Sequence, residues 1–183
     1  MRGSDPAGGP TRAGDRAAVD AARFRDAMRV LPSGVVMVTV AVDGRPWGLT
    51  ISSCCSLSAE PPQILISLAT RTVTCQQILK TGTFGISVLG AHHGEVAAVG
   101  AASGAAKFVD GYCDECEIEA GSPRVRDAVY HLDCRLADAH EHADHTVIIG
   151  AVVNAEPTPA DRPLEPLIYF DRSYRRVGAG LPG

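Results

Sequence analysis

Residues 48–68 constrain the fold most strongly, because hydroxyl-bearing and apolar side chains alternate along this segment. A period of two is typical of extended chain, in which successive side chains point to opposite faces. Thr50 and Ser52, with the serines that follow, are therefore expected on one face. Leu49 and Ile51 point the other way, into a core. The segment predicts strands with one packed face and one hydroxyl-lined face that can bind a polar ligand.

Turn residues divide this part of the chain into strands. Asp43-Gly44 separates residues 35–42 from residues 45–52 and suits a two-residue type I′ turn, so these ranges predict a hairpin. Pro61-Pro62 ends the pairing of the serine-rich segment, since proline cannot donate a ladder hydrogen bond. Residues 63–68 then read as a buried strand.

The remaining pattern predicts a mainly β domain with flanking helices. Phe24, Ala27, Met28 and Leu31 recur at helical spacing before Pro32 and predict an amphipathic helix that covers one end of the fold. Further strands are expected near 83–89, 129–140, 145–154 and 166–170, with helices near 72–81 and 91–101. Mostly antiparallel strands of this kind favour a barrel over a βαβ array. We expect one domain over residues 19–178, between a disordered tail at 1–18 and a flexible end at 179–183.

Composition excludes several classes of partner and location. The chain has 183 residues, 45% hydrophobic and 21% charged, which suits one soluble domain. Its net charge is −4 and its longest basic cluster is Arg175-Arg176, so we expect no nucleic-acid partner. No apolar run approaches the roughly 20 residues that cross a bilayer, so no membrane association is expected. Six cysteines without an export signal indicate a reduced, cytoplasmic protein.

The start of the helix near residue 72 is a candidate anion site. The N–H groups at a helix start favour phosphate, and Arg71 adds a charged fork beside the hydroxyls of Ser67, Thr70 and Thr72. In the alternative interpretation, Thr70 or Thr72 only caps the helix and Arg71 is solvated. Neither a Gly-x-Gly-x-x-Gly turn nor a Walker-type loop occurs in the chain, so any nucleotide is held in another way.

An ordered series of motifs carries a family resemblance over roughly residues 22–177. The motifs are residues 32–39, Asp43-Gly44-Arg45-Pro46, residues 48–53, Ser56-Leu57-Ser58, Pro61-Pro62, residues 83–89, Lys107-Phe108, residues 143–146, Gly150-Ala151-Val152, residues 166–170 and Tyr174-Arg175-Arg176. This series resembles the short-chain flavin reductase family, the reductase components of two-component flavin monooxygenases. The resemblance implies an FMN-binding split barrel, an antiparallel Greek-key barrel that forms a homodimer.

The resemblance also implies roles for individual residues. Thr50, Ile51, Ser52 and Ser53 would run along the isoalloxazine ring and ribityl chain, while Ser67, Arg71 and Thr72 would hold the flavin phosphate. Lys107 is a further binding candidate, although a solvated lysine beside a buried Phe108 explains it equally well. Tyr169, Phe170, Arg172 and Tyr174 form an aromatic and basic strand pair that either closes the flavin pocket or closes the barrel.

Asp144-His145 matches the family's Gly-Asp-His motif, with Ala143 in place of the glycine. A left-handed turn at Ala143 would cost about 1 kcal/mol or more. The resemblance places His145, with Asp144, beside the flavin where the nicotinamide stacks. Hydride transfer needs no general acid, so His145 is expected to position NAD(P)H. The alternative is a hydrogen-bonded histidine at the start of a strand.

Other conspicuous side chains have interpretations that compete with a flavin site. His140, Glu141, His142, Asp144 and His145 offer metal ligands, but on a strand His140 and His142 face away from His145, so no functional metal site is expected. Cys113 and Cys116 have redox or zinc spacing without a second pair. Cys75 and Cys134 read as small core residues, Cys54-Cys55 as residues of the strand near the flavin, and no cysteine as catalytic. Trp47 either stacks on a ligand or, preferably, packs at the barrel edge.

These observations predict an NAD(P)H:flavin oxidoreductase that reduces FMN or FAD, using NADH or NADPH, and releases reduced flavin to a partner monooxygenase. One alternative is a flavoprotein with permanently bound FMN that acts directly on an organic substrate. The other is a non-enzymatic flavin- or metal-binding module centred on residues 140–145.

Overall fold

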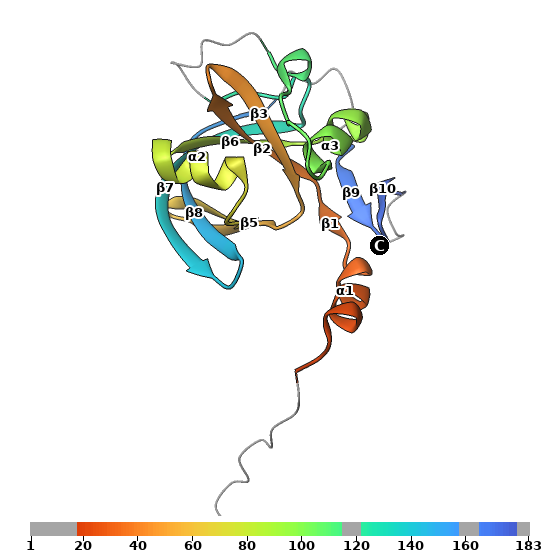
Figure 1. Ribbon diagram of the computed structural model, residues 1–183. Helices are drawn as coiled ribbons and strands as arrows, with labels where there is room; N and C mark the ends of the chain where they lie inside the picture. Colours follow the sequence, from red (N-terminus) through yellow and green to blue (C-terminus); the bar gives the residue numbers. More distant parts are fainter. Residues whose placement is uncertain (1–17, 115–121, 158–164, 179–183) are drawn as a thin grey trace, which may run out of the picture.

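The computed structural model describes residues 18–114, 122–157 and 165–178. The predicted disordered tail, except its last residue, and the predicted flexible C-terminal end lie outside the described residues. The main sheet has seven antiparallel strands (Figure 1). They are β2 (Val36–Val42), β3 (Arg45–Ile51), β4 (Cys54–Ala59), β5 (Pro62–Ala69), β6 (Thr83–Val88), β7 (Tyr130–His142) and β8 (His145–Pro157).

The connection between β3 and β4 forces this sheet to curl into a barrel. The strand order is β3-β2-β6-β7-β8-β5-β4, so β3 and β4 lie at opposite edges. Only Ser52 and Ser53 separate the end of β3 from the start of β4, and the two edges must therefore approach each other. β3 and β4 are not paired with each other among the described strands, so the barrel is split along a seam between them.

The topology agrees with the predicted Greek-key barrel. β6, β7 and β8 follow one another as antiparallel neighbours, while β5 precedes β6 in the chain yet pairs with β8. The predicted hairpin at Asp43-Gly44 is confirmed, because β2 pairs with β3 and both turn residues have positive φ, 50° and 71°. The fold is thus mainly β and antiparallel, as the sequence predicted.

The serine-rich segment differs from its predicted form. Its residues are extended, but β3 ends at Ile51 and the chain crosses the seam before β4 begins at Cys54. β4 then pairs with β5, with a register shift between Ser56 and Ser58. A second strand here was not predicted, since unbroken alternation does not reveal where a strand changes its partner.

Two apolar cores lie on the two sides of β2, whose alternating residues are buried on both faces. Val36, Val38 and Val40 belong to the core inside the barrel, together with Cys75 and Ile78 of α2 (Val73–Thr81). Val35 and Met37 belong to a second core with Val96 and Ala97 of α3 (Gly94–Ala101). α3 therefore packs on the outside of β2 and β3, beside the short η1 (Asp110–Tyr112).

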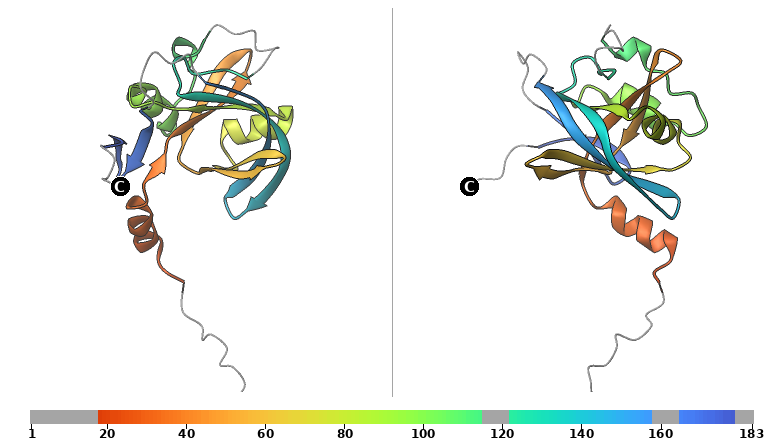
Figure 2. Two further views of the ribbon diagram at one scale, coloured as in Figure 1. Left: turned by 180° about the vertical axis from the view of Figure 1, so that it is seen from behind. Right: turned by 90° about the vertical axis from the view of Figure 1, so that its left-hand side faces the viewer.

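A small second sheet and one projecting helix complete the described structure. β9 (Leu167–Phe170) pairs with β1 (Ser33–Gly34) and with β10 (Ser173–Arg176). α1 (Ala21–Arg29) is capped by the Asp20 carboxylate, which accepts from two main-chain N–H groups at 2.9 Å. The predicted amphipathic helix is present, but none of its residues is buried, and it stands off the barrel in every view (Figure 2). The prediction that it covers one end of the fold is wrong for the single chain. Among the described residues, Asp26 and Arg29 contact the β9–β10 turn, while the apolar side chains of the helix stay exposed.

Within the described residues, no helix is long and apolar enough to cross a membrane.

Candidate functional site

A cavity of about 420 Å³ lies at the seam of the barrel, where β3 ends. Its walls come from the end of β3, from small residues of α3 and from the hairpin of β9 and β10. The lining residues are Val35, Thr50, Ile51, Ser52, Ala98, Ala101, Ala102, Tyr169, Arg172 and Tyr174. Five of the predicted binding residues, Thr50, Ile51, Ser52, Tyr169 and Tyr174, thus lie around one cavity although they come from distant parts of the chain.

The β3 wall offers polar groups that nothing in the described structure engages. The Thr50 hydroxyl oxygen is buried and has no hydrogen-bond partner. A Cβ on Gly100 would fall directly against this oxygen, so the hydroxyl faces α3 and is shielded from the cavity. Leaving it unpaired costs the fold roughly 1–3 kcal/mol. β3 is also an edge strand, so its outward N–H and C=O groups lack a strand partner apart from the region near Trp47 and Gly48. These groups fit a flat ring that carries donors and acceptors along its edge, as a flavin does.

The close approach of α3 to β3 depends on Gly100. A Cβ on this residue would lie 2.8 Å from the Met37 Cε and 2.9 Å from the Thr50 main-chain nitrogen. The helix backbone therefore rests directly against Thr50. Because Ala98, Ala101 and Ala102 are small, their side of the cavity stays open to an occupant.

Beyond the cavity the seam continues to the start of α2 through a pair of serines. The Ser53 hydroxyl donates to the Ser67 carbonyl at 2.7 Å, and the Ser67 N–H donates to the Ser53 carbonyl at 3.1 Å. The Thr72 hydroxyl accepts from the Cys75 N–H at 3.3 Å and donates to the Ala69 carbonyl at 2.8 Å, so Thr72 is the N-cap of α2. Arg71 is exposed beside it. The capping interpretation of Thr72 is therefore correct, and a phosphate contact from this segment remains a prediction.

Asp144 and His145 lie next to this helix start. The Thr70 N–H donates to the Asp144 carbonyl at 3.0 Å, and His145 pairs with Ala69 across the sheet. The His145 Nδ1 lies 2.7 Å from an Asp144 carboxylate oxygen, and the hydrogen bond from His145 holds the pKa of Asp144 below its ordinary value. Ala143 has φ 53°, so the left-handed turn that its motif position suggested is present. The structure thus brings Asp144, His145 and Arg71 together at one end of the seam.

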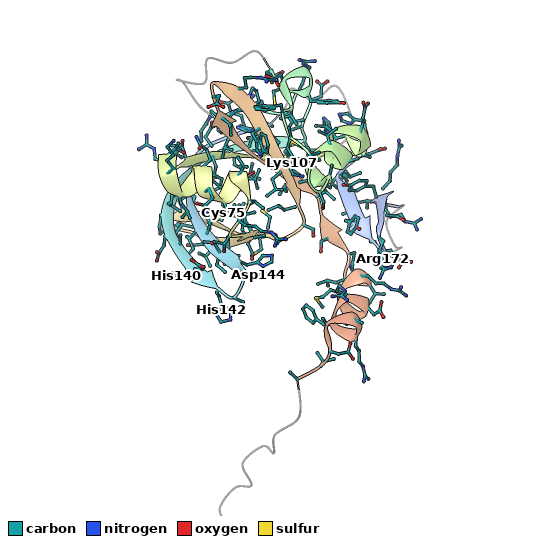
Figure 3. The ribbon with its side chains drawn as sticks, in the orientation of Figure 1. Cys75, Lys107, His140, His142, Asp144 and Arg172 are labelled. Atoms are coloured by element: carbon teal, nitrogen blue, oxygen red, sulfur yellow. The ribbon has the colours of Figure 1, made fainter. Side chains whose placement is uncertain are left out.

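Arg172 and the two tyrosines close the opposite end. The rings of Tyr169 and Tyr174 meet edge to face with centroids 5.6 Å apart, and burial raises the pKa of Tyr174. Figure 3 shows Arg172 on this hairpin, whereas Asp144 lies at the tip of the β7–β8 hairpin on the other side. Phe170, from the same predicted strand pair, is exposed and does not line the cavity.

Lys107 and Trp47 have structural contacts. The Lys107 Nζ donates to the Gly100 carbonyl at 2.7 Å and also to the Ala102 carbonyl, both at the end of α3. It thus binds the negative end of the helix dipole behind the cavity wall, and burial lowers its pKa. Trp47 packs edge to face against Phe108, with ring centroids 5.0 Å apart, in agreement with the packing interpretation.

The thiols do not favour nucleophilic chemistry. Cys75 and Cys134 are buried in the barrel core, as predicted. Burial raises the pKa of Cys54 to about 11 and that of Cys134 to about 12, which keeps both thiols protonated near neutral pH. Cys116 lies outside the described residues, so the spacing with Cys113 is not tested. The described residues contain no group of three or more potential metal ligands, and the His140 Nε2 instead lies 3.0 Å from an Asp138 carboxylate oxygen.

Sequence reasoning missed the α3 wall of the cavity. The available signal was the run of small residues near 97–104, which permits close helix packing but does not say against which strand. Arg172 was noted only as part of the closing hairpin, although it lines the cavity itself.

Comparison with known proteins agrees with this geometry. The family described as flavin reductase like domain matches residues 28–178. The flavin reductase (NADH) of Kitasatospora aureofaciens is 37% identical over 167 residues, covering 86% of this chain and 82% of the relative. The reductase component of 4-nitrophenol 4-monooxygenase/4-nitrocatechol 2-monooxygenase from Rhodococcus opacus is 34% identical, covering 83% and 78%.

Solved structures include the NADH:FAD oxidoreductase SgcE6 of Streptomyces globisporus C-1027 in complex with NAD and FAD fragments. It superposes with a TM-score of 0.77 at 32% identity, over 87% of this chain and 93% of that chain. The resemblance drawn from the sequence motifs is thereby confirmed. The chain belongs to the flavin reductase like domain family.

Proposed function

We propose that this chain is an NADH:flavin oxidoreductase that reduces FMN or FAD and releases the reduced flavin to a partner monooxygenase. The observation that carries this proposal is the cavity at the barrel seam, whose wall combines the hydroxyl-bearing residues Thr50 and Ser52 with the outer edge of β3. The relatives supply the reaction class, since one is named a flavin reductase (NADH) and another a monooxygenase reductase component.

Polar contacts along the seam suit a flavin that must leave after reduction. A bound flavin supplies the ring that accepts hydride from the nicotinamide. Thr50, Ile51 and Ser52 would line that ring, and the edge amides of β3 would donate to ring atoms that gain electron density. Ser53 and Ser67 lie along the seam between the cavity and the start of α2, where Arg71 and Thr72 would meet the flavin phosphate.

His145 has a positioning role in this proposal. Its Nδ1 hydrogen bond to Asp144 orients the imidazole and leaves Nε2 to face a ligand. We expect His145→Asn to raise the KM for NADH severalfold with a smaller change in kcat, because hydride transfer requires no proton from the histidine. Flavin affinity measured without nucleotide is expected to stay within about twofold of the parent value, which separates nucleotide positioning from loss of the fold.

The choice of nucleotide, the cellular environment and the oligomeric state are also proposals. NADH is favoured over NADPH as the donor because the relatives are named for NADH. A reduced, cytoplasmic environment suits the free thiols of Cys54, Cys55, Cys75 and Cys134. A homodimer is supported by the family resemblance and by the exposed apolar side chains of α1.

The test is oxidation of NADH and NADPH, followed at 340 nm, by the purified protein with and without excess riboflavin, FMN or FAD. Turnover that rises with added free flavin supports the reductase and identifies both substrates. Flavin that stays bound through purification, with no turnover on added flavin, would instead favour a flavoenzyme acting directly on an organic substrate. Flavin binding without any nucleotide oxidation would favour a binding module.

A further inference from the structure

Arg172 stands out among the residues around the cavity by its charge. Of the described lining residues it alone is charged, the others being apolar, small, hydroxyl-bearing or phenolic. Its side chain is 67% exposed, so the guanidinium lies on the solvent side of the cavity. A fixed positive charge at such a place attracts an anionic ligand group from solvent.

The backbone conformation at position 172 makes the presence of an arginine there informative. Asp171 and Arg172 form the turn between β9 and β10 with φ of 48° and 60°. Left-handed backbone costs a residue with a Cβ about 1–2 kcal/mol, and glycine is the residue that avoids this cost. A strained arginine on the wall of a cavity points to a use for its side chain.

The ion pairs of Arg172 are too weak to explain why an arginine occupies this strained turn position. Its Nη2 lies 3.7 Å from an Asp26 oxygen, and the same oxygen lies 3.8 Å from Arg29. Arg29 also approaches Asp171 at 3.5 Å. All four side chains are more than two-fifths exposed, and exposed pairs of this length contribute little. The Arg172 guanidinium can therefore exchange Asp26 for a stronger ligand.

We propose that Arg172 recognises a phosphate group of the ligand that occupies the cavity, and that it is a specificity-determining residue for phosphorylated flavin or nucleotide. This inference rests on the proposed function. A guanidinium binds phosphate through two parallel hydrogen bonds, which a carboxylate 3.7 Å away does not match. Arg71 lies at the other end of the seam, so the two arginines can serve phosphates of different ligands.

The test compares Arg172→Gln, which keeps the strained backbone, with Arg172→Gly, which relieves it. Equilibrium binding of riboflavin, FMN and FAD is measured by quenching of flavin fluorescence. Binding of adenosine and ADP-ribose is measured by calorimetry. Both variants are expected to lose about fivefold or more in affinity for the phosphorylated ligand and less than twofold for its phosphate-free counterpart, and the loss should shrink as salt rises. If the two variants change the free energy of unfolding in opposite directions but lose the same affinity, the loss of affinity is not caused by backbone strain.

The outcomes also distinguish the source of the phosphate. A loss of affinity for FMN and FAD but not for riboflavin shows that Arg172 contacts the flavin phosphate. A loss of affinity for ADP-ribose but not for adenosine shows that it contacts a phosphate of the pyridine nucleotide. Equal effects on phosphorylated and phosphate-free ligands, or no phosphate-dependent binding in the parent protein, overturn the proposal. Failure of the parent protein to oxidise NADH with added flavin, while it still binds these ligands, overturns the proposed function alone.

Two further variants exclude simple clamping of α1. Asp26→Asn removes the same ion pair without touching the guanidinium. If Arg172 only holds α1, Asp26→Asn should lose as much affinity for the phosphorylated ligand as the Arg172 variants do. If Arg172 recognises phosphate, Asp26→Asn should bind the phosphorylated ligand as tightly as the parent protein or more tightly. Arg175→Gln removes an arginine of the same hairpin that does not line the cavity and is expected to leave all affinities within about twofold.

Discussion

Two threonines carry buried hydroxyl oxygens without a hydrogen-bond partner in the described structure, but only one of these residues lines the cavity. Thr50 lies on the β3 wall, whereas Thr74 is fully buried in α2. The Thr50 hydroxyl itself faces Gly100 of α3, so in both residues the unpaired hydroxyl lowers the stability of the fold.

We therefore expect Thr50→Val and Thr74→Val to leave the free energy of unfolding unchanged or to raise it by up to about 1 kcal/mol, because each removes an unpaired buried hydroxyl. Because the Thr50 hydroxyl is shielded from the cavity, both variants are expected to keep the flavin affinity within about twofold of the parent value. Denaturant unfolding and flavin titration measure the two quantities. A loss of flavin affinity confined to Thr50→Val would contradict the shielded position of this hydroxyl.

The buried His131 makes the free energy of unfolding depend on pH. Its side chain is 2% exposed, with Nδ1 3.0 Å from the Ser87 hydroxyl and Nε2 3.2 Å from the Ser122 hydroxyl and 3.3 Å from an Asp133 oxygen. Burial lowers the pKa of His131 below 6.5, although the Asp133 charge opposes this shift. Burial likewise lowers the pKa of His93.

Because both pKa values are lowered in the folded protein, the unfolded chain binds protons first as the pH falls below about 6.5. The free energy of unfolding is therefore expected to decrease below that pH. His131→Gln and His93→Gln should each reduce the slope, and the double variant should reduce it most. Denaturant midpoints between pH 7.5 and pH 5 check this, and an unchanged slope in the double variant would refute it.

At the scale of elements, the contact of α3 with β3 shapes the cavity. Gly100→Ala would insert a methyl group against Thr50 and Met37, so α3 must move away from the strand. We expect a loss of about 1–3 kcal/mol in the free energy of unfolding, together with weaker flavin binding. Gly94→Ala, in the same helix, meets no heavy atom within 4 Å and serves as the control. Equal effects of the two substitutions would argue against the close contact.

The β7–β8 turn offers a test of backbone strain. Ala143→Gly should raise the free energy of unfolding by up to about 1 kcal/mol, because glycine adopts the φ of 53° without a Cβ penalty. Gly82→Ala is the reverse case, since Gly82 ends α2 with φ 74° and open space around it. It should lower stability by a similar amount. Thermal unfolding of the two variants measures both changes, and a shift of the same sign in both would disprove the interpretation.

At the scale of the whole molecule, α1 leaves apolar surface uncovered. Phe24, Met28, Val30 and Leu31 are 46–57% exposed, and the helix touches the rest of the chain mainly through Arg29, Asp26 and the β9–β10 turn. A helix with a strong apolar stripe gains stability by burying it against another surface. We therefore expect this surface to lie in the proposed homodimer.

Phe24→Ser combined with Met28→Ser should shift the protein toward monomer, as measured by light scattering after size exclusion. Glu60→Ser, in the exposed turn between β4 and β5, is the control and should leave the oligomeric state unchanged. A parent protein that is monomeric at all concentrations, or a variant that remains fully dimeric, would contradict a role for α1 in the dimer.

Much of the fold was readable from local chemistry. The Asp43-Gly44 turn and the alternation along β3 depend on residues that are neighbours in the chain, so the sequence alone predicts them. A cap at Thr70 or Thr72 was one of two interpretations that the sequence left open, and the structure identifies Thr72 as the cap. The end of β3 at Ile51 was not readable, because both sides of the break are extended and only strand pairing distinguishes them.

The same division applies to the site. The sequence by itself determined the hydroxyl-rich strand, since its residue types carry their chemistry locally. The Asp144-His145 turn was expected from its resemblance to the family's Gly-Asp-His motif. Only the tertiary structure decided that Thr50 stays unpaired, that the Lys107 ammonium binds the end of α3 and that Arg172 lines the cavity. These properties depend on which distant segments meet at the barrel seam, and long-range packing of that kind leaves no periodic or compositional signal in the chain.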